Sequence, residues 1–378
     1  MPAVATSGAP GCTTQTAAAR KLADVRTAMV PAAGNPFGVV APPGGRWAFV
    51  GLSSAGAVGV FRDGDSGAPA AVRRVAAPGQ PLGEALTRDG RYLLAADGRA
   101  GAAVIDTSRA EQGRPGAVLG TLSAPGGSGA IEVAVSPDDR FAFVSLEDSA
   151  ELAVFRLRRA LADGFSRSDF VGTIPVGDAP VGLAISPDGR WLYATSETAP
   201  AATPAGGSQG GSRIAPGTLT VISLHRAETD PPGSVMSTVT AGCSPVRVIV
   251  SADGSVVWVT ARESDALLGF SASRLRSDPG RALIARVGVG EAPVGLALAG
   301  HGTRIVVADS NRFRAGGAAS SLAVVSVSAA LAARPALLGY FPAGGFPREL
   351  ALEPGGRTLL VSNFSSQQLE AVDVASLP

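Results

Sequence analysis

A single hairpin-like stretch recurs along the whole chain and constrains its fold more than any other feature. Its clearest copy is VGLAISPDGRWLYA at 181–194, in which two short apolar runs flank a Pro-Asp-Gly turn. Val181, Leu183 and Ile185 alternate before the turn, and an aromatic and apolar run follows it, as in a half-buried strand. Proline presets φ in a turn and glycine supplies the positive φ that closes it, so this stretch is predicted to form a β-hairpin.

The hairpin occurs seven times, with turn positions 45 to 65 residues apart. These positions are Gly45, Gly90, Asp139, Gly189, Gly254, Gly302 and Gly356. A third apolar run follows each hairpin, and a fourth follows a short link, as in FVGTIPVG at 170–177. Four-strand units with this period indicate the blades of a β-propeller. A β-sandwich is disfavoured, because nothing in a sandwich requires one turn to be repeated seven times.

The two ends of the chain predict a closed ring. The last unit ends at QLEAVDVASLP without a fourth strand, whereas ADVRTAMVPAAG at 23–34 is a spare strand ahead of the first hairpin. We therefore predict an all-β, seven-bladed propeller of four-stranded antiparallel blades, in which the N-terminal strand completes the last blade. Residues 22–378 are predicted to form this single domain. Residues 1–21 are small and polar, and we predict a disordered tail there.

Composition excludes several classes of partner. The net charge of +1 provides no basic field for nucleic acid or for a membrane surface. No apolar run of about 18 residues is present, so no membrane-spanning helix is expected. The first 21 residues lack the basic start and apolar core of a secretory signal. Neither the composition nor the N-terminal residues indicate the cellular compartment of the protein.

Two cysteines leave two alternatives. Cys12 lies in the predicted tail, and Cys243 lies in the loop that enters the fifth unit. A disulfide between them is possible, but two unpaired thiols are the simpler expectation.

Three charged residues are expected at the mouth of the central channel. Seven residues before the turn position, four copies have glycine, while the others have Glu132, Arg247 and Glu349. Arg348 lies beside Glu349. In a propeller these positions face the channel mouth, which is the default place for a ligand. We expect the charges to converge there, where they either hold a polar ligand or neutralise one another.

A second set of polar residues belongs to the loops on the same face. These residues follow the turn position by seven or eight residues, and they are Glu147, Glu197, Arg262, Asp309 and Asn363. Together with Glu132, Arg247, Arg348 and Glu349, they are the candidate ligand-binding residues. Acid, amide and guanidinium groups suit a polar or sugar-like ligand, although any soluble rim is similarly polar.

The sequence shows no established catalytic or cofactor motif. Neither His225 nor His301 has Cys, His or carboxylate neighbours at metal-ligand spacing, so no metal site is expected. No Gly-rich phosphate loop is present, and no cofactor is expected. A Ser-His-Asp triad cannot be assembled at the predicted mouth, because neither histidine belongs to it. The catalytic residues stay unassigned.

The repeats resemble those of the bacterial YVTN family. The resemblance lies in GDAPVGLAISPDGRWLYATSE at 177–197 and in GGFPRELALEPGGRTLLVSNF at 344–364, with LYATS and LVSNF at the YVTN position. It covers residues 22–378, and it implies a seven-bladed propeller. The YncE-like branch of this superfamily implies an extracytoplasmic binding or scaffold module, with a periplasmic or secreted location.

A second branch resembles bacterial 6-phosphogluconolactonase and implies ring-opening chemistry at the mouth. Its Pro-Arg-His element corresponds to Pro347 and Arg348 here, but Glu349 replaces the histidine. We therefore expect a YncE-like monomer that binds a small polar ligand or a protein partner. The alternative is a lactone hydrolase in which Arg348 acts with Glu132 or Glu349. A third possibility is an assembly surface without a ligand.

Overall fold

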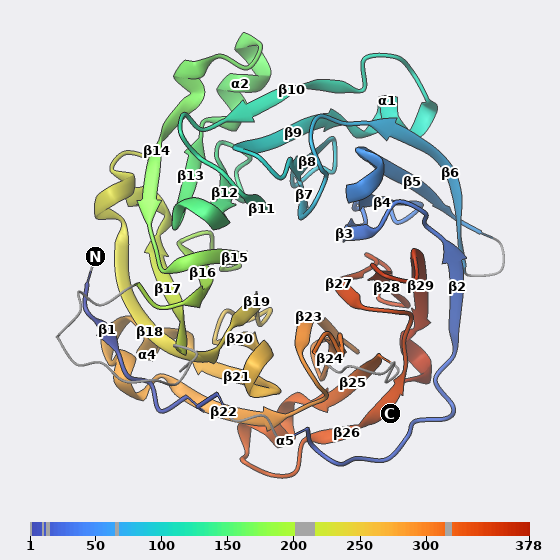
Figure 1. The fold of residues 1–378 in the computed structure, drawn as a ribbon, viewed down its shortest axis with the longest axis vertical. Coiled ribbons are helices and arrows are strands. Elements are labelled where there is room, and N and C mark those ends of the chain that lie inside the picture. Colours follow the sequence, from blue (N-terminus) through green and yellow to red (C-terminus); the bar gives the residue numbers. More distant parts are fainter. Residues whose placement is uncertain (1, 10, 13–15, 65–67, 201–215, 314–319) are drawn as a thin grey trace.

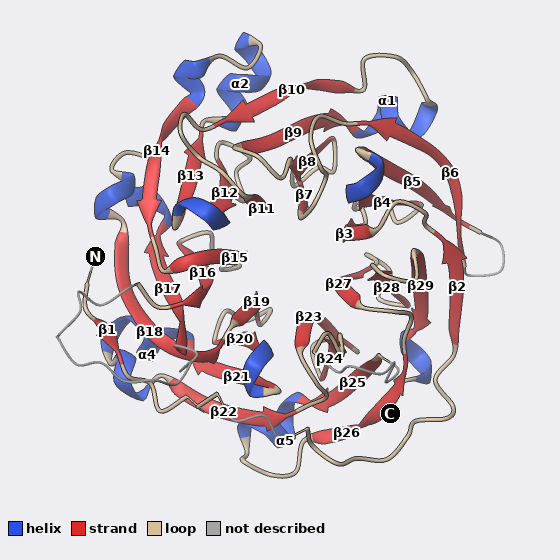
Figure 2. Ribbon diagram, viewed as in Figure 1, coloured by secondary structure: helices blue, strands red, loops and turns tan. Residues whose placement is uncertain are grey.

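Seven four-stranded antiparallel sheets form a ring around a central channel (Figures 1 and 2). The computed structural model describes residues 2–9, 11–12, 16–64, 68–200, 216–313 and 320–378. In every blade the first strand lies nearest the axis and the fourth lies at the outer rim (Figure 1). The predicted fold class is confirmed.

The first three blades use consecutive strands. Blade 1 contains β3 (Pro36–Val40), β4 (Trp47–Leu52), β5 (Ala57–Asp63) and β6 (Pro69–Ala76). Blade 2 contains β7 (Glu84–Leu86), β8 (Tyr92–Ala96), β9 (Gly101–Asp106) and β10 (Val118–Ser123). Blade 3 contains β11 (Ala130–Val135), β12 (Ala142–Leu146), β13 (Glu151–Phe155) and β14 (Phe170–Pro175).

The next three blades follow the same order. Blade 4 contains β15 (Asp178–Ile185), β16 (Trp191–Thr198), β17 (Pro216–Ser223) and β18 (Val235–Cys243). Blade 5 contains β19 (Pro245–Val250), β20 (Val256–Ala261), β21 (Ala266–Ser271) and β22 (Leu283–Gly288). Blade 6 contains β23 (Pro293–Ala299), β24 (Arg304–Asp309), β25 (Ser321–Ser326) and β26 (Leu337–Pro342).

Blade 7 joins the two ends of the chain. It contains β27 (Pro347–Leu352), β28 (Thr358–Asn363), β29 (Gln368–Asp373) and the N-terminal β2 (Thr27–Pro31). β2 pairs antiparallel with β29 over five residues, from Thr27 opposite Val372 to Pro31 opposite Gln368. The predicted closure of the ring by the N-terminal strand is confirmed.

Short helices link the third and fourth strands of blades 2 to 6. They are α1 (Thr107–Gln112), α2 (Leu157–Asp163), α3 (Leu224–Ala227), α4 (Ala272–Ser277) and α5 (Val327–Leu331). Four of the five begin at an Asp or Ser whose side chain accepts a hydrogen bond from a backbone N–H in the first turn. Such caps satisfy donors that have no partner within the helix.

The repeated turn is held by its own side chains. In blade 4, the Ser186 hydroxyl donates to Asp188, and Asp188 accepts from the Arg190 N–H at 3.1 Å. Gly189 has φ of +68°, which few residues other than glycine adopt readily. Blades 2, 3 and 5 repeat the Ser/Thr-x-Asp contact. The hairpin is thus a local structure, which is why its pattern is readable in the sequence.

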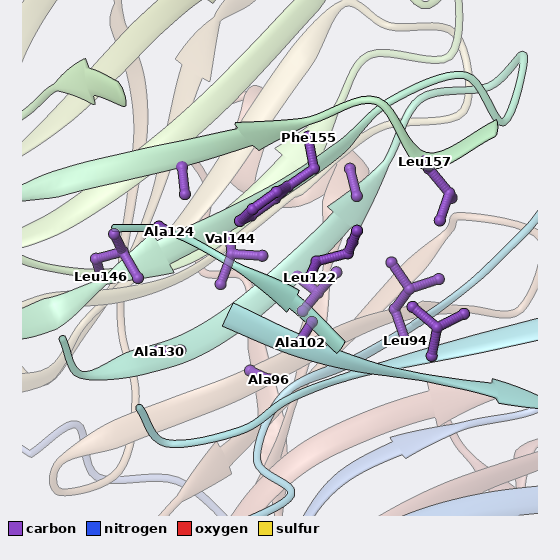
Figure 3. Packing of buried hydrophobic residues seen from close by; sticks show 14 of the residues in the cluster. Leu94, Ala96, Ala102, Leu122, Ala124, Ala130, Val144, Leu146, Phe155 and Leu157 are labelled. Atoms are coloured by element: carbon purple, nitrogen blue, oxygen red, sulfur yellow. The ribbon is translucent and has the colours of Figure 1, made fainter. Parts of the chain in front are cut away.

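The hydrophobic core lies between neighbouring blades. Between blades 2 and 3, for example, the buried side chains of Leu94 and Leu122 on one sheet pack with Val144 and Phe155 on the other and with Leu157 of α2 (Figure 3). Each sheet therefore buries both of its faces. Removing one blade would expose two such layers, so the ring is expected to unfold as a unit.

The N-terminal segment runs along the outer rim instead of hanging free. β1 (Val4–Ala5) pairs in parallel with β18 of blade 4, and Lys21 forms a bridge with Tyr340 of blade 6 (Figure 1). We call the described residues between 2 and 22 the N-terminal strap. A disordered tail was predicted over residues 1–21, and these contacts correct that expectation for the described part of it. Residues 1, 10 and 13–15 lie outside the described residues. Backbone pairing to a sheet edge needs no apolar pattern, so composition gave no sign of it.

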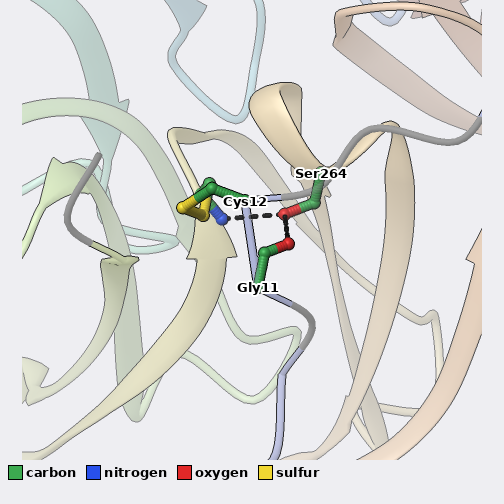
Figure 4. The surroundings of a disulfide bond; sticks show 4 residues. Gly11, Cys12 and Ser264 are labelled. Carbon is green, nitrogen blue, oxygen red and sulfur yellow. Dashed lines mark hydrogen bonds between the residues drawn. A yellow bond between two sulfur atoms is a disulfide. The ribbon is translucent and has the colours of Figure 1, made fainter. Parts of the chain in front are cut away.

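A disulfide fixes the strap to the blades. Cys12 is bonded to Cys243, with 5.3 Å between the two Cα atoms. The Ser264 hydroxyl accepts a hydrogen bond from the Cys243 N–H and donates to the Gly11 carbonyl (Figure 4). The expectation of two unpaired thiols is therefore wrong. The cysteines are 231 residues apart in sequence, and only the folded ring brings them together.

Loss of the disulfide is expected to lower stability markedly. Cross-links that close long loops restrict the unfolded chain, and a typical contribution is about 2–4 kcal/mol. A Cys12→Ala/Cys243→Ala variant should therefore melt below the parent protein. Addition of dithiothreitol should bring the parent down to the same melting temperature and leave the variant unchanged. A parent protein that melts equally with and without reductant would contradict a stabilising cross-link.

No helix in the described part of the chain is long and apolar enough to cross a membrane.

Candidate functional site

The innermost strands crowd together at the residues that were predicted to face the channel. A Cβ atom at Gly182 would collide with the Val246 carbonyl oxygen of the next blade, and one at Gly295 would collide with that of Arg348. Gly38 and Gly83 face the carbonyls of Leu82 and Ile131 in the same way. Glycine at these four positions is therefore a steric requirement of the ring.

Hydroxyl groups on the second strands position the charged residues. The Thr260 hydroxyl accepts from the Arg247 N–H at 3.1 Å and donates to the Val294 carbonyl of the next blade at 2.6 Å. In blade 7, the Ser362 hydroxyl accepts from the Glu349 N–H and donates to the Phe37 carbonyl of blade 1. Each hydroxyl thus ties a channel-facing residue to the adjacent blade.

Arg247 lies at the centre of a buried ion network that spans the channel. Its guanidinium contacts Glu349 of blade 7 and lies 3.3 Å from the Glu132 carboxylate of blade 3. It also donates to the Val181 carbonyl of blade 4 at 3.1 Å. Arg247 is only 5% exposed. One side chain from blade 5 therefore connects three other blades, and its charge is neutralised within the protein.

A third carboxyl group, Glu84, lies close to this network, and it was missed in the sequence. It is 8% exposed, and neither of its oxygens has a well-formed hydrogen bond in the described part of the protein. Burial first, and the nearby Glu132 second, raise the pKa of Glu84 well above its ordinary value. The repeat alignment does carry a signal: six residues before the turn, the other six copies have valine or leucine.

Glu132 also favours its neutral form. Burial is the main cause, and together with the charge of Glu349 it outweighs the attraction of Arg247, so that the pKa of Glu132 rises to about 8. Near neutral pH the guanidinium of Arg247 is thus balanced mainly by Glu349. A carboxyl group that is protonated near neutral pH does not serve as a general base.

Stability is expected to fall as the pH rises from about 5 to 8. In this window Glu84 and Glu132 are protonated in the folded protein but ionised in the unfolded chain, so the folded state binds more protons and the free energy of unfolding decreases with pH. Glu84→Gln should melt near the parent at pH 5 and above it at pH 8. Glu151→Gln, at the start of β13, is the control. If the parent and Glu84→Gln show the same pH profile, the buried acid is not responsible.

Arg348 lies at the mouth among phenylalanines. Its guanidinium carbon is 3.8 Å from the ring centre of Phe37, 5.0 Å from that of Phe346 and 5.4 Å from that of Phe364. Within the described residues no carboxylate lies within 4.0 Å of it, and its buried Nε has no hydrogen-bond partner. Burial, followed by the charge of Arg247, lowers the pKa of Arg348 to about 9, so it remains a cation at neutral pH.

The phenylalanines continue into an alternating series of rings and guanidinium groups. Arg312 lies 6.0 Å from the ring centre of Phe346 and 5.9 Å from that of Phe313, and Arg262 lies 5.8 Å from Phe313. We call this series the arginine–phenylalanine ladder; its members are Arg262, Phe313, Arg312, Phe346, Arg348, Phe37 and Arg247. Cations over aromatic faces are held without a counter-charge.

The two ends of the ladder are paired with acids and its middle is not. Arg262 bonds to Glu197 at 2.6 Å, and Arg247 bonds to Glu132 and Glu349. In the described chain, Arg312, like Arg348, has no carboxylate within 4.0 Å. Glu147 lies in the short 3-10 helix η2 (Glu147–Ser149), where the charges of Arg348 and Arg262 both act to lower its pKa. Burial, and then Glu197, raise the pKa of Glu147.

Two predicted site residues belong elsewhere. Asp309 is fully buried at the end of β24, where it accepts from the Ser321 hydroxyl at 3.3 Å. Asn363 is fully buried at the end of β28 and donates to Glu370 at 2.9 Å. Both side chains turn into their own blades, so the prediction that they meet the other residues at the mouth is corrected. The other seven residues do gather around the channel.

The site offers charge and aromatic surface more than reactive groups. Among the described residues, no three His, Cys, Asp or Glu side chains are grouped closely enough to share a metal ion. Glu132 and Glu349, which would be the bases in ring-opening chemistry, both lie against Arg247. The arrangement is suited to electrostatic recognition of an anion.

Comparison with known proteins shows the fold but neither a family nor a function. No family model matches the chain, and no curated protein matches it. Hydrazine synthase of Kuenenia stuttgartiensis matches 91% of this chain and 97% of its own, with a TM-score of 0.70 and 17% identity. A chain of a mitotic checkpoint complex matches 96% of this chain and 95% of its own, with a TM-score of 0.68 and 14% identity. At these identities the chain is similar to both as a β-propeller scaffold.

Proposed function

We propose that the protein is a binding module whose channel mouth receives a negatively charged group, carried by a small polar ligand or by a partner protein. The observation that supports this most is the pair Arg312 and Arg348 in the middle of the ladder. Within the described residues these two guanidinium groups have no carboxylate within 4.0 Å, whereas both ends of the ladder are ion-paired. A carboxylate accepts two parallel hydrogen bonds from one guanidinium, so this anion suits the site.

The resemblance of the repeats to the YVTN family supports the same choice. In the YncE-like branch the propeller is a binding or scaffold module, and an extracytoplasmic location follows from that resemblance. The Cys12–Cys243 disulfide supports an oxidising compartment as well. We place the protein there and treat it as a monomer.

The test uses matched acids and amides. Succinate, benzoate and gluconate should raise the melting temperature of the parent protein, whereas the corresponding amides should not. Arg348→Met keeps a long apolar side chain and removes the charge, so this variant should lose the response. Arg357→Met changes the net charge equally in an exposed hairpin turn on the opposite face, and it should respond as the parent does. Equal shifts with acids and amides, or an unchanged response in Arg348→Met, would refute the proposal.

Lactone hydrolysis is the competing function, and nothing at the mouth favours it. It needs an ionised carboxylate that is free to activate water, but Glu132 is held largely neutral and Glu349 is bonded to Arg247. We expect no turnover of sugar lactones or aryl esters. Turnover by the parent that disappears in an Arg348→Ala/Glu349→Ala variant would instead place the protein in the lactonase branch.

A further inference from the structure

The N-terminal strap shows where a blade of this propeller accepts an extended segment. On blade 4 it pairs at Thr238, and on blade 6 it pairs at Tyr340. The Tyr340 N–H donates to the Arg20 carbonyl at 3.0 Å, and the Tyr340 carbonyl accepts from the Leu22 N–H at 2.6 Å. A residue at this position of an outer strand therefore directs both its N–H and its carbonyl toward the free edge of the sheet.

Thr238 and Tyr340 are equivalent positions in the two blades. Thr238 pairs with Thr220 and Tyr340 pairs with Ala323, and each lies two residues beyond a one-residue bulge in the outer strand. In blade 1 the same register belongs to Arg74, which pairs with Gly59 beyond the bulge at Val72. No described strand pairs with the free edge of β6. The edge that the strap covers on blades 4 and 6 is thus open on blade 1.

The two sides of this edge differ in chemistry. Toward blade 7 lies a cleft of about 180 Å³ with a mainly apolar lining that includes Pro31, Leu52, Phe61 and Val72. Toward blade 2 lies a groove of about 340 Å³ lined by four arginines, which are Arg73, Arg74, Arg109 and Arg114. Arg73 and Arg74 line both the cleft and the groove.

The groove carries positive charge that the protein does not neutralise. Arg109 has a weak contact of 3.9 Å with Asp106. For the other three arginines, the described residues provide no carboxylate within 4.0 Å. Among the residues that the structure describes, the buried Nε of Arg73 has no hydrogen-bond partner, and the Arg74 guanidinium donates to the Ala33 carbonyl. Arg73 is half-buried, and Arg74, Arg109 and Arg114 are exposed. A cluster of guanidinium groups without a nearby carboxylate favours an acidic occupant.

We propose that the free edge of β6 binds an extended segment of a partner protein in which apolar and acidic residues alternate. Side chains of a strand point alternately to its two faces. A segment paired at Arg74 would therefore direct one set into the apolar cleft and the other onto the arginine groove. Its backbone would bond to β6 as the strap bonds to β18 and β26. This surface is separate from the channel mouth and does not depend on the function proposed for it.

The binding test uses three fluorescein-labelled eight-residue peptides and fluorescence anisotropy. One peptide alternates Val and Glu, the second alternates Val and Lys, and the third has four Val followed by four Glu. We expect the alternating acidic peptide to bind at least tenfold more tightly than either of the others. Binding should weaken as salt is raised, because arginine charge contributes to it.

Matched variants separate backbone pairing from charge. Arg74→Ala removes one charge and keeps the outward N–H, whereas Arg74→Pro removes both, and proline is tolerated at such an edge position. We expect a loss of threefold or less for Arg74→Ala, and of tenfold or more for Arg74→Pro and for Arg114→Glu. Thr121→Pro makes the same change at the equivalent position of β10 and should leave binding unchanged. Unaltered melting temperatures show that the variants fold.

Several outcomes would overturn the proposal. No binding of the alternating acidic peptide at 100-fold excess over the protein would do so. Equal affinity for the block peptide, or equal affinities of Arg74→Pro and Arg74→Ala, would show an anion-binding patch without strand pairing. Equal affinity for the lysine peptide would remove the role of the arginine groove.

Discussion

A chain that lacks residues 1–31 is expected to melt at least about 10 °C below the full protein, because it loses the strand that closes the ring. β2 pairs with β29 over five residues, and its Val30 packs against the buried core that includes Leu360 and Leu369. Without β2, the edge of β29 and part of this core meet water. Loss of β2 and its contacts is expected to cost about 5 kcal/mol, and loss of the disulfide about 2–4 kcal/mol more. Together these losses correspond to roughly 10 °C for a chain of this size.

A shorter deletion separates closure from the strap. Removal of residues 1–20 eliminates β1 and the disulfide but keeps Leu22 and β2. This variant should lose about as much stability as the double cysteine variant. The further decrease from this variant to the one without residues 1–31, followed by circular dichroism on heating, measures the closing strand. Identical melting temperatures for the two truncations would show that β2 contributes nothing.

Arg247→Met is expected to destabilise the protein by about 3–5 kcal/mol, which is the usual cost of leaving one partner of a buried ion pair alone. The variant removes the cation that connects blades 3, 4 and 7 with blade 5 and leaves the Glu349 carboxylate buried without its partner. The loss should appear in urea unfolding as a lower midpoint with an unchanged slope. It should grow with pH, because Glu132 ionises near pH 8.

The rescue variant tests whether charge or packing causes the loss. Arg247→Met/Glu132→Gln/Glu349→Gln removes the cation together with both acids, so most of the lost stability should return. Arg247→Lys keeps the charge but cannot make the forked contacts, and it should lie between the parent and Arg247→Met. If the triple variant is no more stable than Arg247→Met, the destabilisation comes from lost packing, and the electrostatic account is wrong.

The fold could be predicted because its signals are local. The Ser-x-Asp-Gly turn is held by contacts between residues two to five apart, as between Ser186 and Asp188, so one copy is readable without the rest of the chain. Seven copies at a regular spacing then leave few architectures, and the spare strand at 23–34 indicates how the ring closes. Neither step requires knowledge of distant contacts.

The candidate site could be predicted only in part. Aligning the repeats on the turn identified Glu132, Arg247 and Glu349, because equivalent positions in a ring of identical blades lie at the same height on the axis. The same alignment wrongly added Asp309 and Asn363, whose side chains turn into the blade interior. It could also have identified Glu84, which is the one acid in an otherwise apolar column.

The repeat thus determined by itself the number of blades and their strand order, since short-range turns and alternating apolar residues encode these. It also indicated Glu132, Arg247 and Glu349 as residues that reach the channel. Only the tertiary structure decided which charges meet. Arg247 and Glu349 are 102 residues apart and Cys12 and Cys243 are 231 apart, and no periodicity relates such positions. The free guanidinium groups among phenylalanines are equally a product of the closed ring, because the contacts of Arg348 with Phe37, of Arg312 with Phe346 and of Arg262 with Phe313 join side chains from different loops.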